Sequence, residues 1–307
     1  MILPKLSRNA AIGVIAPAYI PVRERLEHGI SYLEKRGLRV IRGESLTKEH
    51  GYFAGNDVQR LADLHRMFAD PQVEMIICAR GGWGGLRIID RIDYGLIKEN
   101  PKPLVGYSDI TTLQLAIWSR TGLPSLSGPM VAVEMGKGIE AFTEAHFWGQ
   151  IFNQSAEYTI DLDQAGARVM NRGNAKGMLL GGCLSMVTGL LGTSYAPDYS
   201  DAILFLEDVG EKPYKIDRYL AQLYQAGIFK KIKGLILGIF DDCQPDPGEV
   251  SFSLKEIIED YFGQLKIPVI IDFPYGHIAR KVTMPIGSLA EIDGHLKKVS
   301  FSNVFRI

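Results

Sequence analysis

The chain has 307 residues, of which 46% are hydrophobic and 33 are glycines, with 34 basic against 35 acidic side chains. This length exceeds the roughly 100–200 residues of one domain and predicts two, and the composition is typical of an α/β protein rather than of a disordered or fibrous one. The formal net charge of -1 supplies no field that would attract a polyanion, which argues against a nucleic-acid partner.

Residues 1–9 lack the apolar core of a secretory signal, and no run approaches the roughly eighteen apolar residues that a membrane span needs. The three cysteines, Cys78, Cys183 and Cys243, are widely spaced, which argues against a disulfide framework and for a reducing compartment. We therefore expect a cytoplasmic protein that does not associate with membranes. Cys78 and Cys183 have apolar neighbours and are predicted to lie in the core.

The first half of the chain alternates apolar runs with amphipathic segments. The expected strands are residues 10–17, 38–41, 73–79 and 103–105; the expected helices are 22–36, 56–70, 86–92, 110–120 and 142–152, with a turn-rich connection at 124–129. Such alternation predicts a doubly wound parallel sheet.

After residues 153–158 the pattern changes, so the sequence predicts an N-terminal domain over 1–155 and a mixed α/β domain over 156–307. The expected strands are 158–160, 167–170, 175–180, 202–206, 234–240 and 269–272, the expected helices are 184–191, 216–226 and 252–262, and a hairpin is expected to turn at Asp293-Gly294. The polar loop 241–249 is a candidate lid or dimer element.

A glycine cluster, Arg80-Gly81-Gly82-Trp83-Gly84-Gly85, follows the third strand. Ligands bind at the carboxyl ends of strands in open α/β sheets, and glycine lets the backbone approach them closely. The cluster lacks both the G-x-G-x-x-G spacing and the P-loop lysine, so it does not predict a nucleotide site. The alternative is a tight turn into the next helix.

Ser108 ends the fourth strand, in Gly106-Tyr107-Ser108-Asp109. A serine at a sharp strand-to-helix turn presents its hydroxyl as a nucleophile does. Either Ser108 or Asp109 could instead be an ordinary helix N-cap, and Asp109 can take that role beside a nucleophilic Ser108.

Ser108, Glu207 and His277 each lie at or just past the carboxyl end of an apolar strand. Serine, imidazole and carboxylate are the groups that nucleophilic acyl transfer needs. Glu207 could instead pair with Lys212 or Arg218, Asp208 competes for its role, and His277 could be a packing residue. Because Glu207 and Asp208 point to opposite sides of a strand, only one of them is expected to serve.

Several stretches together resemble the LD-carboxypeptidase family of serine peptidases, which includes the self-immunity peptidases that inactivate microcin C-type antibiotics. They are Cys78 to Gly84, Pro103 to Thr111, Leu206 to Glu211, Ile216 to Arg218, and Gly276-His277 with Pro285 to Gly287. The resemblance implies a Ser108–Glu207–His277 triad, and an N-terminal domain like the class I glutamine amidotransferase fold with the active site between the two domains.

The resemblance further implies an oxyanion hole, placed on the backbone N–H groups of Asp109 and Gly82. The expected substrate is a cytoplasmic murein tetrapeptide that loses its terminal D-alanine during peptidoglycan recycling, and the expected assembly is a homodimer. Arg80, Gly81 and Trp83 are the candidate substrate-binding residues, with Arg87 or Arg280 as further anion partners.

Two residues depart from the family's pattern. Trp83 replaces a common tyrosine, and Ser127 replaces a common histidine before Gly128-Pro129. No metal or redox cofactor is expected, because the chain has no H-E-x-x-H motif and no Cys/His ligand spacing. Two other functions remain open: an immunity-type peptidase acting on a peptidyl-nucleotide antibiotic, and a non-catalytic protein that binds peptidoglycan fragments.

Overall fold

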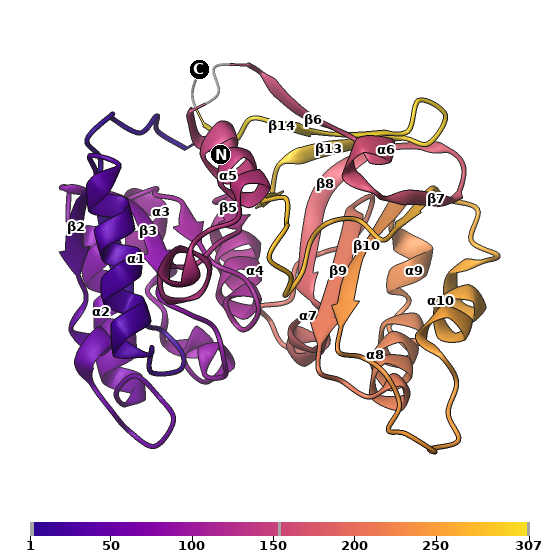
Figure 1. Cartoon of the computed structure of the whole chain (residues 1–307), viewed down its shortest axis with the longest axis horizontal. Helices are drawn as coiled ribbons and strands as arrows, with labels where there is room; N and C mark the ends of the chain where they lie inside the picture. The colour runs from indigo at the N-terminus through magenta and orange to yellow at the C-terminus, as the bar shows by residue number, and fades with distance from the viewer. Residues whose placement is uncertain (1–2, 153–154, 306–307) are drawn as a thin grey trace. The chain divides into compact units, whose positions relative to one another are not determined.

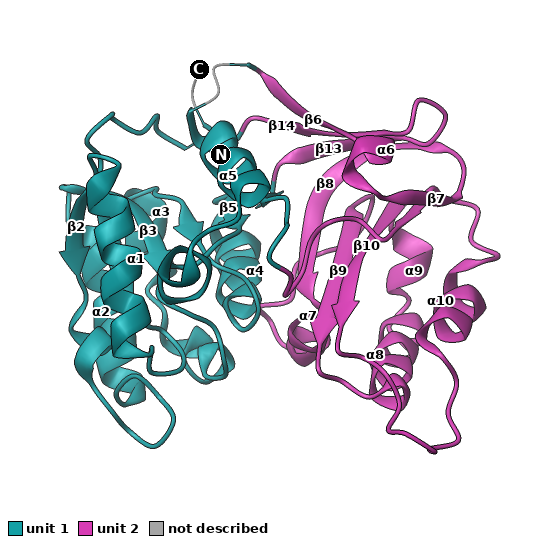
Figure 2. Cartoon of the chain, viewed as in Figure 1, with its two compact units in different colours: residues 1–155, 279–287, 304–307 teal, residues 156–278, 288–303 magenta. Residues whose placement is uncertain are grey.

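The computed structural model describes residues 3–152 and 155–305, which form two compact units (Figure 2). Unit 1 comprises residues 1–155, 279–287 and 304–307, and unit 2 comprises residues 156–278 and 288–303. The sequence assigned all of 156–307 to one domain, whereas the chain returns to unit 1 after residue 278. The reason is that residues 284–286 form an edge strand of the unit 1 sheet. Residues 153–154 of the predicted boundary lie outside the described residues.

Unit 1 contains a six-stranded sheet in the order β12-β5-β4-β3-β1-β2 (Figure 1). Its strands are β1 (Ala11–Ile15), β2 (Arg39–Arg42), β3 (Val73–Cys78), β4 (Leu104–Val105), β5 (Ser125–Ser127) and β12 (Met284–Ile286). Strands β1 to β4 pair in parallel as the sequence predicted, β5 extends the parallel pairing, and β12 pairs antiparallel with β5. Helices cover both faces of such a sheet, which is why β1 is buried along its whole length.

The helical segments of unit 1 form two layers. They are α1 (Arg23–Lys35), α2 (Asp57–Ala69), α3 (Tyr94–Glu99), α4 (Ile110–Thr121) and α5 (Ala141–Phe152), with short turns η1 (Glu44–Thr47), η2 (Gly85–Arg87) and η3 (Ile89–Arg91) and a π-helical turn η4 (Val131–Met135). Helices α2, α3 and α4 pack in sequence, and α1 packs on η4. The chain moves along the sheet in one direction from β1 to β2 and in the opposite direction from β2 to β3. Because both crossovers are right-handed, the helices α1 and α2 that they contain lie on opposite faces of the sheet.

Two predicted segments of unit 1 are wrong. The helix expected at 86–92 is a pair of 3-10 turns, and the true helix start is Asp93, whose carboxylate accepts the Leu96 N–H at 2.9 Å to cap α3. The turn-rich connection expected at 124–129 contains β5, which is fully buried between two strands. A buried strand is normally recognised in a sequence by a run of apolar residues. This segment has serines and flanking prolines instead, so its sequence did not indicate a strand.

Unit 2 contains an eight-stranded mixed sheet in the order β6-β14-β13-β8-β9-β10-β11-β7. Its strands are β6 (Glu157–Asp161), β7 (Arg168–Asn171), β8 (Asn174–Cys183), β9 (Ile203–Val209), β10 (Gly234–Asp241), β11 (Val269–Ile271), β13 (Leu289–Asp293) and β14 (Lys298–Ser302). The central strands β8 to β11 run parallel, so their carboxyl ends share one edge (Figure 1). The outer strands pair antiparallel, and the predicted hairpin is β13–β14.

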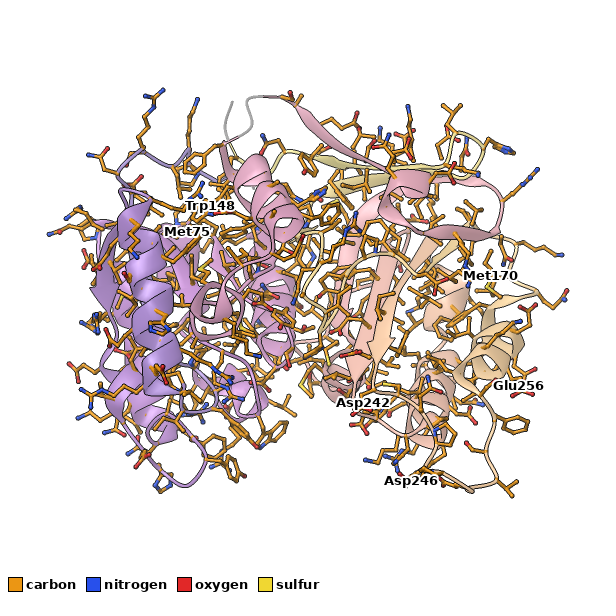
Figure 3. The ribbon with its side chains drawn as sticks, viewed as in Figure 1. Met75, Trp148, Met170, Asp242, Asp246 and Glu256 are labelled. Atoms are coloured by element: carbon orange, nitrogen blue, oxygen red, sulfur yellow. The ribbon has the colours of Figure 1, made fainter. Side chains whose placement is uncertain are left out.

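The helices of unit 2 are α6 (Leu162–Ala165), α7 (Leu184–Leu190), α8 (Pro213–Gln225), α9 (Ile228–Lys231) and α10 (Leu254–Phe262). A capping box between Ser253 and Glu256 fixes the start of α10, with Glu256 on the outside of the unit (Figure 3). In the preceding loop lies Asp246, which is labelled in Figure 3. It forms an ion pair with Lys212.

The three cysteines are buried, and none of them forms a disulfide bond. Across the described ranges, no helix combines the length and the apolarity that crossing a membrane requires.

Candidate active site

Ser108 lies on a strained turn at the carboxyl end of β4. Its φ is 64°, the left-handed region that a residue with a side chain rarely adopts, and its side chain is partly exposed. The Ser108 carbonyl accepts the N–H of Thr111 at 2.9 Å, which begins α4 directly after the serine. Such strain persists only where neighbouring residues fix the backbone, and it is the geometry of a nucleophile elbow.

Asp109 fixes the turn from the helix side, but it does not do so as a cap. Its side chain makes no capping hydrogen bond to α4; instead, its Oδ2 accepts the N–H of Gly85 at 2.8 Å. Asp109 thus occupies the predicted N-cap position of α4, but its carboxylate binds the glycine loop and does not cap the helix. Burial raises the pKa of Asp109 to about 6, against the opposing effects of backbone N–H groups and of Arg60.

The glycine loop fits around the serine turn. A Cβ at Gly81 would lie 2.9 Å from Ser108 Cβ and 3.2 Å from Ser108 Oγ, so the loop backbone approaches the hydroxyl too closely for any side chain. Gly82 has a φ of +123°, and a Cβ there would lie 2.4 Å from the Tyr19 ring. Below the loop the buried Arg60 guanidinium donates to the Gly84 carbonyl at 3.1 Å. The cluster is thus a tight turn whose shape brings backbone groups beside Ser108.

In unit 2, His277 and Glu207 form a hydrogen-bonded pair. His277 Nδ1 lies 2.7 Å from Glu207 Oε2. The Glu207 side chain is fully buried and that of His277 is 16% exposed, so a buried carboxylate holds the imidazole. Gly276 and Gly238 leave the space for this contact, since a Cβ on Gly276 would lie 3.1 Å from Glu207 Oε2 and one on Gly238 would lie 3.2 Å from Glu207 Cβ. Gly238 carries no signal in the sequence, and its close approach to Glu207 identifies it.

Asp208 has different partners on the opposite side of β9. Its carboxylate accepts the N–H groups of Ser185 and Val209, at 2.8 and 2.9 Å. Burial raises its pKa, and the neighbouring Glu207 adds to that effect. Strand alternation therefore separates the two acidic residues as expected, and the contact with His277 is made by Glu207. Of the alternative partners considered for Glu207, Lys212 is paired with Asp246.

Among the candidate substrate contacts, Arg80 is partly buried beside the glycine loop. Its guanidinium lies 5.5 Å from the Tyr19 ring centroid and donates to the carbonyls of Gly81 and Ile20, at 3.3 and 3.5 Å. A groove of about 750 Å³ in unit 1 is lined by Arg80 together with the acidic residues Glu27 and Glu49 and with apolar residues such as Ile20 and Leu26.

The other candidates contribute less. Arg87 is engaged in an ion pair with Asp57 at 2.9 Å, and Arg280 lies over the Phe142 ring at 3.7 Å. Trp83 is half-buried within the loop. Ser127, which replaces the family's histidine, is fully buried on β5. Over residues 3–152 and 155–305, no three His, Cys, Asp or Glu side chains gather as a metal site would need.

Unit 1 therefore presents a serine on a strained strand-to-helix turn, and unit 2 presents an imidazole held by a buried carboxylate. These are the parts of a serine hydrolase built on α/β sheets. The chain belongs to the LD-carboxypeptidase family: the family's N-terminal domain matches residues 12–128, and its C-terminal domain matches residues 176–292.

Relatives of known name agree with this assignment. The chain is 39% identical to the probable murein peptide carboxypeptidase of Bacillus subtilis, over 94% of this chain and 90% of that protein. It is 31% identical to the murein tetrapeptide carboxypeptidase of Pseudomonas aeruginosa, over 94% of each chain.

Solved structures share the fold across both units. The crystal structure of a muramoyltetrapeptide carboxypeptidase from Oxalobacter formigenes has a TM-score of 0.85 at 31% identity, covering 95% of this chain and 98% of that one. The microcin self-immunity protein MccF has a TM-score of 0.91 at 23% identity, covering 98% of each chain. At that identity the second likeness shows the fold alone.

Proposed function

We propose that the protein is a serine LD-carboxypeptidase that hydrolyses the amide between an L-centre and a C-terminal D-amino acid, with Ser108, Glu207 and His277 as its triad. The observation that carries the proposal is the 2.7 Å contact between His277 Nδ1 and Glu207 Oε2. With Nδ1 engaged, Nε2 is the nitrogen that takes the proton of the serine hydroxyl.

In this mechanism Ser108 Oγ attacks the amide carbonyl while His277 accepts its proton. The oxyanion binds the N–H groups of Asp109 and Gly82, which border the serine turn. His277 then protonates the leaving amine, and water, deprotonated by His277, releases the acyl group from Ser108. Removing one oxyanion donor typically costs about 10²–10³ in kcat.

The proposed substrate is a murein tetrapeptide that releases D-alanine, as the names of the relatives indicate for those proteins. Arg80 supports this substrate, because a carboxypeptidase needs a cation for the terminal carboxylate and the described partners of Arg80 are carbonyls and a ring. Gly81 and Trp83 would complete that contact. The proposal places the enzyme in cytoplasmic peptidoglycan recycling, as a homodimer.

The deciding experiment measures D-alanine release from murein tetrapeptide by the purified protein and by Ser108→Ala. We expect turnover by the wild type and none by Ser108→Ala. Glu207→Gln should lower kcat by about 10²–10⁴ because the imidazole loses its orienting carboxylate. Asp208→Asn, the matched control on the same strand, should retain most of the activity.

A second candidate is an immunity-type peptidase, which Trp83 favours because an indole in the glycine loop could stack on a nucleobase. A processed microcin-like amide, assayed in parallel, tests it: cleavage of that amide without D-alanine release would replace the first proposal by the second. If Ser108→Ala changes neither turnover nor labelling by a serine-directed phosphonate, the serine hydrolase proposal fails, and if the wild type also turns over neither substrate, binding of peptidoglycan fragments without catalysis remains.

A further inference from the structure

A buried ionic cluster lies next to the proposed nucleophile, and it consists of Tyr107, Glu134 and Lys281. The Lys281 ammonium donates to Glu134 Oε1 at 2.7 Å, and the Tyr107 hydroxyl donates to the same oxygen at 2.8 Å. Lys281 is 1% exposed, Tyr107 4% and Glu134 9%. Burying charged groups costs desolvation free energy, which the attraction between paired charges offsets only in part. We therefore asked what this buried cluster does.

The cluster holds the residue that precedes Ser108. Besides the hydroxyl contact, the Lys281 ammonium lies 3.8 Å from the centroid of the Tyr107 ring, so the ring is fixed at its face and at its end. On the other side of the serine, the Asp109 carboxylate is fixed to Gly85. The φ of 64° at Ser108 is therefore flanked by two anchored side chains. A strained residue needs such neighbours to stay in place.

Glu134 is itself presented by an unusual element. It belongs to η4, a single π-helical turn. Such turns are rare and occur frequently at functional sites. The second carboxylate oxygen of Glu134 accepts the Met130 N–H at 2.9 Å. The turn packs on α1 so closely that a Cβ on Gly29 would lie 1.9 Å from the Val131 carbonyl oxygen. The acceptor that holds Tyr107 is therefore rigid.

Lys281 connects this anchor to the segment that carries the proposed base. It follows His277 by only four residues, and four residues of chain span at most about 14 Å. The backbone of this segment is fixed in unit 1: Thr143 Oγ1 donates to the Ala279 carbonyl at 2.6 Å and accepts the Lys281 N–H at 2.8 Å. The lysine side chain thus joins the segment after His277 to the residue before Ser108.

We propose that Tyr107, Glu134 and Lys281 are positioning residues that hold the strained serine turn of unit 1 in place. This inference rests on the proposed function, because it assigns the cluster a part in the rate of acylation. They act on the rate through the backbone of Ser108, which directly follows Tyr107.

The test compares Tyr107→Phe and the charge-free pair Lys281→Met/Glu134→Gln with a matched control, Lys102→Met. Lys102 is also a buried lysine of unit 1, 7% exposed, and its ammonium donates to backbone carbonyls of Met67 and Asp70 at the opposite end of β4. Removing it should destabilise unit 1 without affecting the serine turn. The readouts are kcat and KM on murein tetrapeptide, the rate of Ser108 labelling by a fluorophosphonate, and the thermal unfolding midpoint.

We expect Tyr107→Phe and the charge-free pair to lower kcat and the labelling rate by about tenfold or more, with KM within about twofold of the wild type, because small misplacements of a reacting group are costly in rate. Lys102→Met should unfold at a lower temperature and keep the kcat of the wild type. If the charge-free pair does not fold, Tyr107→Phe decides, since it removes a single oxygen atom.

Wild-type kcat and labelling rate in Tyr107→Phe, or an equal loss of kcat in Lys102→Met, would overturn the inference and reduce the cluster to a stabilising contact. Failure of the proposed function has a different signature. In that case the wild type itself neither releases D-alanine nor reacts with the fluorophosphonate.

Discussion

The carboxyl group of Asp109 makes the stability of unit 1 fall as the pH rises, whereas carboxyl groups in folded proteins usually have the opposite effect. Burial raises its pKa to about 6, whereas the same group in an unfolded chain titrates near its ordinary pKa of 3.8. The folded protein therefore holds this proton more tightly than the unfolded chain does. The stability that the group contributes is complete below pH 4 and is lost as the pH rises to about 6.

Asp109→Asn should remove this dependence, because the amide oxygen still accepts the Gly85 N–H but carries no titrating proton. We expect the variant to gain stability over the wild type by about 1–3 kcal/mol between pH 4 and pH 7, measured by urea unfolding at several pH values. Asp57→Asn is the control: the Arg87 and Arg60 side chains lower the pKa of Asp57, so its stability difference should be flat above pH 5. A flat difference for Asp109→Asn as well would contradict the assignment.

Sequence and structure differ in what they reveal about single residues. The choice between Glu207 and Asp208 was reduced by the two-residue period of a strand, and the hydrogen bond to His277 then distinguished the two. The ion pair between Glu134 and Lys281 could not be predicted, because 147 positions separate the two residues. Glutamate and lysine are also residue types that usually lie on the surface. A buried ion pair leaves no periodic signal in a sequence.

At the scale of elements, the glycine loop after β3 and the turn after β4 form one interlocking feature. Gly81 lies against Ser108, Gly85 is bonded to Asp109, and Gly84 is bonded to Arg60. The sequence predicted both segments at strand ends. The family resemblance implied that Gly82 lies near Ser108, whereas the contacts of Gly81 with Ser108 and of Gly85 with Asp109 are known only from the structure, in which β3 pairs with β4.

Gly81→Ala tests this interlock. Its new Cβ would lie 2.9 Å from Ser108 Cβ, so the serine turn must shift, and we expect fluorophosphonate labelling of Ser108 to slow by about tenfold or more. Gly189→Ala is the matched control, because Gly189 lies within α7 and a Cβ added there would meet no atom within 4 Å. Alanine there should leave labelling unchanged and stabilise the helix by about 0.5–1 kcal/mol. Equal labelling rates in both variants would show that the loop does not constrain the serine.

The predicted helices α1, α2, α4 and α5 match the structure to within one residue at each end, whereas α8 begins three residues before its predicted start. The predicted secondary structure was wrong where composition and structure diverge. The segment Ser125–Ser127 has hydroxyl side chains in a fully buried strand, and residues 86–92 form 3-10 turns because the capping carboxylate is that of Asp93. Long-range pairing decides such segments, and local preference does not.

At the scale of the whole molecule, the chain passes between the two units more than once, and this makes the N-terminal half dependent on distant residues. Residues 279–287 supply β12, which pairs with β5 at the edge of the unit 1 sheet, and they supply the lysine that pairs with Glu134. Sequence patterns predicted a division near residue 155 but not this return, because a three-residue edge strand has no detectable period.

A fragment of residues 1–155 should therefore fail to fold stably on its own. It would lack β12, leaving the backbone of β5 without one neighbour, and its Glu134 carboxylate would be buried without Lys281. Removing one partner of a buried ion pair costs about 3–5 kcal/mol, a large part of the roughly 5–15 kcal/mol that holds a domain together.

The measurement is circular dichroism with urea unfolding of two fragments: 1–155 alone, and the same fragment with residues 279–287 attached through a flexible glycine-serine linker. We expect a cooperative transition only in the second. Replacing Lys281 by Met within the attached segment should lower the transition midpoint again, which separates the contribution of the ion pair from that of the added strand. A cooperative transition in 1–155 alone, at the same urea concentration as in the linked fragment, would show that unit 1 does not need the returning segment.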